Sequence, residues 1–124
     1  MDLVAKRFAD TVVLFPVGRI DHATADPLRD AIAVHVGPSA AGRDRVVIDL
    51  SGVEYISSVG LRVLMVASKE AKTHGRTLAV CGLQPVVREI FEISRFNLVL
   101  KVFATLREAL TAVSPAALAA YEAA

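Results

Sequence analysis

Two neighbouring serines, Ser57 and Ser58, are the residues of this chain best placed to do chemistry. They follow a short apolar run at residues 46–50, which is suited to a central strand, and they precede a long helical pattern. In an α/β sheet, ligands and modifications usually meet the protein where parallel strands end and the next helices begin. The pattern also fits a plain structural role, in which the Ser58 hydroxyl caps the helix by accepting a hydrogen bond from a backbone N–H.

Gly60 adds to the interest of this junction. It falls in the first turn of the predicted helix, where glycine costs up to about 1 kcal/mol relative to alanine. We therefore expect another stretch of backbone, or a partner, to come close to this residue.

No motif for catalysis or metal binding accompanies the serines. The sequence has no glycine-rich phosphate loop, no nucleophile elbow and no group of His, Cys and carboxylate residues with metal-ligand spacing. His22, His35 and His74 are widely separated, and we interpret each as a surface or helix-end residue. Cys81 lies in an apolar strand pattern without a basic neighbour, which favours a small buried residue over a reactive thiol. The sequence therefore predicts a binding protein without a cofactor or metal, rather than an enzyme.

Length and composition indicate one folded domain. The chain has 124 residues, of which 54% are hydrophobic and 22% are charged, unlike a disordered chain. Its 14 Lys and Arg residues against 13 Asp and Glu residues give a net charge of +1, so nucleic acid is not an expected partner. No apolar run approaches the roughly 20 residues that cross a bilayer, and no secretory signal pattern is present. With a single cysteine, the chain reads as cytoplasmic and free of membrane insertion, and its oligomeric state stays open.

The first half of the chain is expected to hold a hairpin and a helix. Residues 12–15 are β-branched or aromatic and stop at Pro16 and Gly18, which predicts a strand paired with a weaker one near residues 3–8. Residues 24–36 carry apolar side chains every four positions and predict a helix. A polar surface loop is expected at residues 39–44.

The second half alternates between helices and strands. After the strand at residues 46–50, the predicted elements are a helix from the two serines to a C-cap at Gly75, a strand at 77–81, a helix opened by Pro85, a strand at 98–103 and a helix at 105–113. The order ββαβαβαβα predicts an α/β fold, with a mixed and mostly parallel sheet packed by about four α-helices. This domain is expected to cover residues 1–113. The alanine-rich extension at residues 114–124 is either a frayed extra helix or a partner-docking segment.

Three segments, in this order along the chain, resemble one known family. They are residues 18–25 (GRIDHATA), residues 49–61 (DLSGVEYISSVGL) and residues 81–91 (CGLQPVVREIF). They are similar to the segment before the first helix, the signature, and the third-helix region of STAS domains, specifically of bacterial anti-sigma factor antagonists of the partner-switching type. The resemblance runs from about residue 3 to residue 113.

This resemblance implies a phosphorylation switch. Ser58 matches the serine that a GHKL-type serine kinase, itself the anti-sigma factor, phosphorylates with its own ATP and magnesium. Members of the family commonly have Asp immediately before that serine, whereas this chain has Ser57, which is therefore the alternative acceptor. The unmodified domain is expected to bind the kinase and release a sigma factor, and a PP2C-type phosphatase is expected to reset the switch. The residues expected to bind the partner are Asp21, Thr24, Ser57, Ser58, Gly60, Leu61 and Arg62.

Two alternatives remain open at this stage. One is a STAS subunit of a partner-switching, secretion or transport complex that contains no sigma factor. The other is a small nucleotide-binding α/β domain, which would need a phosphate cradle or a catalytic pair.

Overall fold

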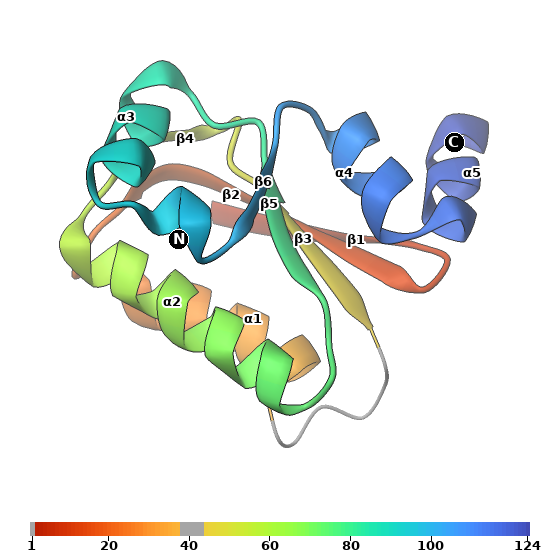
Figure 1. The fold of residues 1–124 in the computed structure, drawn as a ribbon, viewed down its shortest axis with the longest axis horizontal. Helices are drawn as coiled ribbons and strands as arrows, with labels where there is room; N and C mark the ends of the chain where they lie inside the picture. Colours follow the sequence, from red (N-terminus) through yellow and green to blue (C-terminus); the bar gives the residue numbers. More distant parts are fainter. Residues whose placement is uncertain (1, 38–43) are drawn as a thin grey trace.

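Six strands form one sheet in the computed structural model, which describes residues 2–37 and 44–124. Its spatial order is β1-β2-β3-β5-β6, and β4 pairs with the far end of β2 (Figure 1). The antiparallel pair is β1 with β2, and the other pairs are parallel, which confirms the predicted mixed sheet. The strands are β1 (Asp2–Phe8), β2 (Thr11–Ile20), β3 (Arg45–Asp49), β4 (Val53–Ile56), β5 (Leu78–Cys81) and β6 (Lys101–Phe103).

Helices cover both faces of this sheet. The helices α1, α2 and α3 share one hydrophobic core with the sheet, and α4 and α5 share a second core on the other face (Figure 1). A short 3-10 helix at Phe96–Leu98 follows α3. No helix of the described chain is both long and apolar enough to cross a membrane. The helices are α1 (Ala25–Val36), α2 (Ser58–Thr73), α3 (Pro85–Ile93), α4 (Leu106–Val113) and α5 (Pro115–Ala123).

The two cores explain why the central strands are apolar without a break. Side chains of a strand alternate between the faces of a sheet, so Val46 and Ile48 of β3 join the core under α1 and α2, whereas Val47 joins the core under α4. In β5, Val80 joins the core under α1 and α2, and Cys81 joins the core under α4. A strand buried on both faces needs an apolar residue at each position.

Strand β2 is longer than the sequence predicts. It continues through Pro16 and Gly18 to Ile20. Its parallel partner is β3 as far as Leu14 and β4 from Gly18 onward. Pro16 lies between these two pairings, where neither partner strand needs a backbone N–H donor from β2. Gly18, with φ +99°, takes the backbone through the change of register.

Two further strands differ from the prediction, and the structure also describes the C-terminal extension and one residue of the predicted loop. The sequence analysis did not predict β4, and β6 is shorter than residues 98–103 because the 3-10 helix occupies the start of that segment. Residues 115–123 form α5, whose Tyr121 ring meets the Phe8 ring edge-on at 5.5 Å between centroids. Of the loop predicted at residues 39–44, Asp44 is described and the rest lies outside the described residues.

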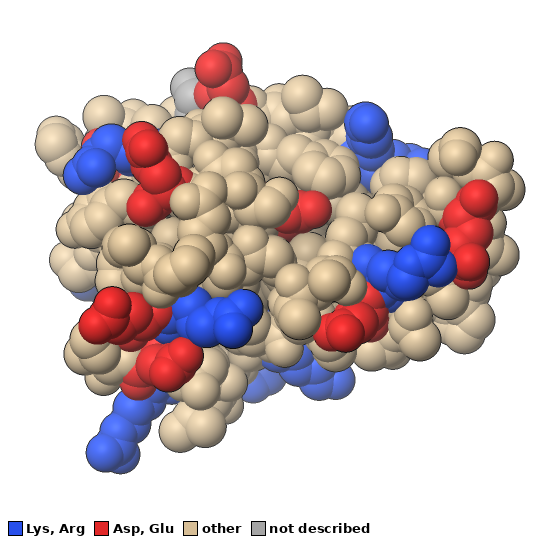
Figure 2. Space-filling view, turned by 90° about the horizontal axis from the view of Figure 1, so that it is seen from above, with Lys and Arg blue, Asp and Glu red and all other residues tan. Residues whose placement is uncertain are grey.

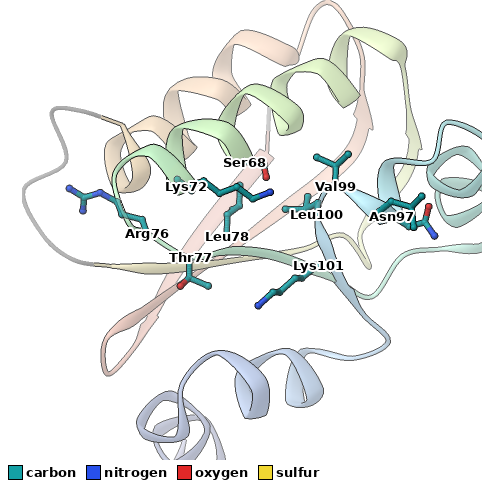
Figure 3. Close-up of a pocket in the computed structure, with 11 residues that line it drawn as sticks. Ser68, Lys72, Arg76, Thr77, Leu78, Asn97, Val99, Leu100 and Lys101 are labelled. Atoms are coloured by element: carbon teal, nitrogen blue, oxygen red, sulfur yellow. The ribbon is translucent and has the colours of Figure 1, made fainter.

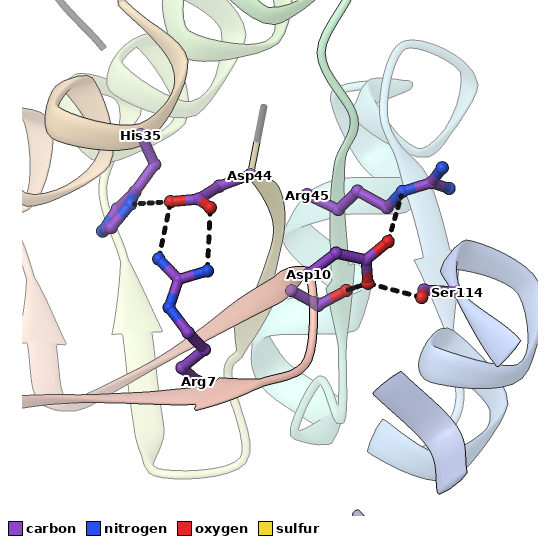
Figure 4. Close-up of polar contacts among 7 residues, drawn as sticks. Arg7, Asp10, His35, Asp44, Arg45 and Ser114 are labelled. Carbon is purple, nitrogen blue, oxygen red and sulfur yellow. Dashed lines mark hydrogen bonds and ion pairs between the residues drawn. The ribbon is translucent and has the colours of Figure 1, made fainter. Parts of the chain in front are cut away.

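Polar contacts tie β1, α1 and β3 together at the end of the sheet where β3 begins (Figure 4). The Arg7 guanidinium donates two hydrogen bonds to the Asp44 carboxylate, at 2.8 and 2.9 Å, and His35 Nδ1 lies 3.0 Å from the same carboxylate. Arg7 is the main cause that lowers the pKa of Asp44 to about 2. In the same view, Ser114 donates to Asp10 at 2.6 Å and so ties α5 to the turn between β1 and β2.

Candidate phosphorylation and partner-binding site

The candidate site lies where β2 and β4 end and helix α2 begins. The backbone N–H of Ser57 donates to the Ile20 carbonyl at 2.8 Å, which joins the end of β2 to the start of the helix. Asp21 follows Ile20 directly, so this bond also places the loop before α1 beside the two serines. Two segments that the sequence analysis selected separately are thus neighbours in space.

The two serines have different structural roles. The Ser57 side chain accepts a hydrogen bond from the Gly60 N–H at 3.2 Å, so Ser57, and not Ser58, is the N-cap of α2. Ser58 is the first residue of the helix, and its side chain is exposed. Within the described part of the chain, the Ser58 hydroxyl takes part in no side-chain hydrogen bond. The fold therefore uses the hydroxyl of Ser57 and leaves that of Ser58 in solvent.

Gly60 is the point of close approach that the sequence predicts, and the approaching group belongs to the chain itself. A Cβ atom at this position would lie 2.6 Å from Ile20 Cγ2 and 2.8 Å from Ile56 Cγ1. Gly60 is buried, so it acts by seating α2 tightly on β2 and β4 rather than by lying on the surface.

The loop before α1 is shaped by Asp21 and Thr24. One Asp21 carboxylate oxygen accepts from the Ala23 N–H at 3.0 Å. The Thr24 hydroxyl accepts from the Asp21 N–H at 2.9 Å and donates to the Arg19 carbonyl at 2.8 Å. Both side chains are half-buried, and these bonds hold the loop in one conformation beside Ser57.

A shallow groove runs along α2 from Ser58. It is bordered on its other side by the segment after α3, and we name it the α2 groove. Three apolar side chains of this groove are well exposed, namely Met65 (36%), Val66 (43%) and Val99 (40%). Exposed apolar side chains gathered in one place are typical of protein interaction surfaces. The lining residues are Ser58, Leu61, Arg62, Met65, Val66, Lys69, Ser94, Phe96 and Val99.

The sequence analysis found only the start of this groove. Leu61, half-buried, and Arg62, exposed, were both selected, whereas Met65, also exposed, was not. The segment after α3 supplies the opposite wall, and its position depends on tertiary packing that no local pattern reveals. Val66 offered one signal, since it is an apolar residue outside the buried stripe of α2.

The charged side chains that line the α2 groove are basic, whereas another face of the molecule carries both acidic and basic side chains. Arg62 and Lys69 line the groove. On the face that contains α3 and α4, acidic and basic side chains are interspersed among uncharged ones (Figure 2). Arg19 stacks its guanidinium over the Tyr55 ring at 4.4 Å, a contact close to the site that the sequence analysis did not identify.

The described residues contain no group of three or more side chains that could hold a metal ion. Cys81 is buried in the sheet, and burial, with a smaller contribution from Asp49, raises the pKa of its thiol to about 12. Such a thiol stays protonated at neutral pH and takes no part in the site.

Comparisons with known proteins agree with this fold. The chain matches the STAS domain model over residues 2–109. Over 101 residues it is 41% identical to "Putative anti-sigma factor antagonist BtrV" of Bordetella bronchiseptica, covering 82% of this chain and 84% of the relative. The crystal structure of an anti-sigma factor antagonist from Mycobacterium paratuberculosis has a TM-score of 0.80 at 28% identity, covering 90% of this chain and 92% of that one.

A third comparison concerns the fold alone. The Bacillus anti-sigma factor antagonist SpoIIAA has TM-scores of 0.74 in its unphosphorylated form and 0.67 in its phosphorylated form, at 19% and 18% identity. The comparison covers 90% of this chain in both cases, with 95% and 98% of the two SpoIIAA chains. The match to the family model covers most of the chain, and the chain belongs to the STAS domain family, with anti-sigma factor antagonists among its relatives.

Proposed function

We propose that the unphosphorylated chain binds a GHKL-type serine kinase that acts as an anti-sigma factor, and that phosphorylation of Ser58 ends this binding. Capture of the kinase releases a sigma factor, and a PP2C-type phosphatase resets the switch. The observation that carries the proposal is the exposed Ser58 side chain at one end of the α2 groove, beside a neighbour that already caps the helix. The name of BtrV, which is 41% identical over 101 residues, supports the same function.

The fold should tolerate a phosphate on Ser58. A phosphoryl group adds about 1.5 to 2 negative charges and three acceptor oxygens. At the first residue of α2 this charge meets the positive end of the helix dipole, which favours it by roughly 0.3–1 kcal/mol. The capping bond from the Gly60 N–H to Ser57 does not involve the modified hydroxyl, so it need not break.

The interface should not tolerate it. Arg62 follows Ser58 by four residues, one turn along the same face of α2, and both line the groove. A phosphate on Ser58 can therefore draw Arg62 toward itself and away from an acidic group on the partner. The phosphate also places charge and bulk beside the apolar wall at Met65 and Val99, where a partner would have to desolvate it.

Three of the other residues expected at the site, Asp21, Thr24 and Gly60, position the start of α2 and the loop beside it. Asp21 and Thr24 hold their loop against the start of α2, and Gly60 fixes the height of the helix above the sheet. Leu61 and Arg62 are the residues of this set, besides Ser58, that line the groove and can touch the kinase directly.

The acceptor is tested by mapping the phosphate. The chain is incubated with Mg-ATP and each purified GHKL-type serine kinase of the source organism, and the product is analysed by mass spectrometry. We expect one phosphate on Ser58 in the parent and in Ser57→Ala, and none in Ser58→Ala. Incorporation that persists in Ser58→Ala, or is lost only in Ser57→Ala, would overturn the assignment and make Ser57 the acceptor.

The switch is tested with a charge mimic. Ser58→Glu should fold like the parent by circular dichroism but bind the kinase about a hundredfold more weakly, which corresponds to roughly 3 kcal/mol of unfavourable charge at the interface. Ser58→Ala is the matched control and should keep the parent affinity. Equal binding by the mimic and the control in calorimetry would discard the switch. A pull-down that captures a partner other than a kinase would favour a STAS subunit without a sigma factor.

A further inference from the structure

A second hollow lies beside the C-terminal half of α2, about 20 Å along the helix from Ser58. It occupies about 440 Å³ between α2, the start of β5 and β6. We name it the Lys72 pocket. Its charged lining residues are Lys72 of α2, Arg76 of the following turn and Lys101 of β6, and its uncharged polar lining residues include Ser68, Thr77 and Asn97.

The charges of this pocket have one sign. Three cationic side chains from three different segments line it, and none of its described lining residues carries a carboxylate. Figure 3 shows Lys72 reaching across the pocket from α2 and Lys101 extending on the opposite side, with Arg76 directed away from the centre. Like charges around a concave surface raise the local positive potential and attract an anion.

The protein's own acceptors near the pocket are already occupied. At the end of α2, the N–H groups of His74, Gly75 and Arg76 donate to carbonyl oxygens of the last turn, at 3.1, 3.2 and 2.7 Å. Among the described residues, no hydrogen bond or ion pair involves the ammonium group of Lys72 or of Lys101, so both are available to an external acceptor.

The pocket also has an apolar side. Leu98 is 77% exposed and Val99 is 40% exposed, and both line the pocket next to Asn97. An ion without an organic part would use the cations and leave this surface in water. A molecule that joins an anionic group to a planar or apolar part would cover both surfaces.

From these features we propose that the Lys72 pocket binds a small phosphorylated metabolite. Its phosphate lies between Lys72 and Lys101, and its organic part rests on Leu98 and Val99. The pocket is separate from the acceptor serine, because 14 residues of helix, or about 20 Å, lie between Ser58 and Lys72, although Val99 lines both the pocket and the α2 groove.

Binding is tested by NMR titration of the full chain with pyrophosphate, adenosine diphosphate and uncharged adenosine. Adenosine diphosphate should shift the amide signals of Ser68, Thr77 and Lys101, bind more tightly than pyrophosphate and lose affinity as salt increases. Adenosine should have no effect. Equal shifts with adenosine, or no shift at these residues at millimolar ligand, would overturn the proposal.

Variants identify the pocket. Lys72→Gln combined with Lys101→Gln should weaken the diphosphate about tenfold or more, because two charge-assisted contacts are lost. Lys69→Gln is the matched control, since Lys69 precedes Lys72 by about one turn and lines the α2 groove instead. Equal weakening by the control, or no weakening by the double variant, would refute the site. Binding to phosphatidylglycerol vesicles without binding of the soluble diphosphate would assign the phosphate to a lipid headgroup and overturn the metabolite.

Discussion

Replacement of Gly60 by alanine tests how α2 is seated on the sheet. The added Cβ would lie 2.6 Å from Ile20 Cγ2, 2.8 Å from Ile56 Cγ1 and 3.2 Å from the Ile20 carbonyl oxygen. Favourable carbon–carbon contacts begin near 3.5 Å, so α2 or the two isoleucines must move by about 0.7–0.9 Å. Ile20 and Ile56 are 0% and 1% exposed and have no free space to enter.

The size of the effect follows from two opposing contributions. Overpacking of this kind costs about 1–3 kcal/mol. Alanine recovers up to about 1 kcal/mol through its higher helix propensity. With a mid-range cost of about 2 kcal/mol and a gain of up to about 1 kcal/mol, Gly60→Ala should lower the free energy of unfolding by about 1–2 kcal/mol, which is a decrease of roughly 1 M in the urea midpoint.

The assay is equilibrium urea unfolding followed by circular dichroism. Val59→Ala is the matched control, because Val59 is the preceding residue of the same turn and is 46% exposed. We expect its midpoint to equal or slightly exceed that of the parent. If Gly60→Ala were as stable as the parent, the close packing of α2 on Ile20 and Ile56 would not constrain this position, and the argument for its glycine would fail.

Three further predictions concern the serines, the carboxylate beside Arg7 and the thiol. Ser57→Ala should cost about 1 kcal/mol in urea unfolding through loss of the N-cap, whereas Ser58→Ala should change stability by less than about 0.5 kcal/mol; equal losses would contradict their separate roles. Because Arg7 lowers the pKa of Asp44 to about 2, the ionised form stabilises the fold above the ordinary carboxyl pKa, and this contribution is lost as the pH falls through about 2. Asp44→Asn should therefore cost about 1 kcal/mol near pH 7, allowing for the exposure of Arg7, and the difference should vanish between about pH 4 and pH 2; a pH-independent difference would refute this linkage. Cys81, whose pKa burial raises to about 12, should react with Ellman's reagent at pH 8 only after unfolding, and rapid reaction of the native chain would show that it is accessible.

The elements of the fold were predictable where a local pattern decides them. Thr105 caps α4 by accepting from Glu108 N–H, and Pro85 opens α3, as the sequence indicates. Strand β4 was not predictable in this way, because its four residues become a strand only through pairing with β2. The same pairing extends β2 beyond Pro16. Proline normally ends a strand, but here it lies between the segment of β2 that pairs with β3 and the segment that pairs with β4.

The site was predictable in part for a similar reason. The motif around Ser58 and the loop at Asp21 lie in the sequence, and their proximity follows from the shared edge of the parallel strands. Which serine caps the helix depends on backbone geometry, and the structure corrects the interpretation of Ser58 as the cap. The outer wall of the α2 groove was not predictable, because Val99 reaches it through the left-handed turn at Arg95 and the 3-10 helix after it.

The separation of capping from exposure at the two serines has a consequence for the lifetime of the chain. Under the proposed phosphorylation, both forms keep the bond between Ser57 and the Gly60 N–H, so modification would not turn the chain into a less stable target for proteases and chaperones. The proportion of the two forms in a cell would then follow from the rates of the modifying enzymes, without selective destruction of either. One population of molecules could pass through many rounds of signalling with no new synthesis.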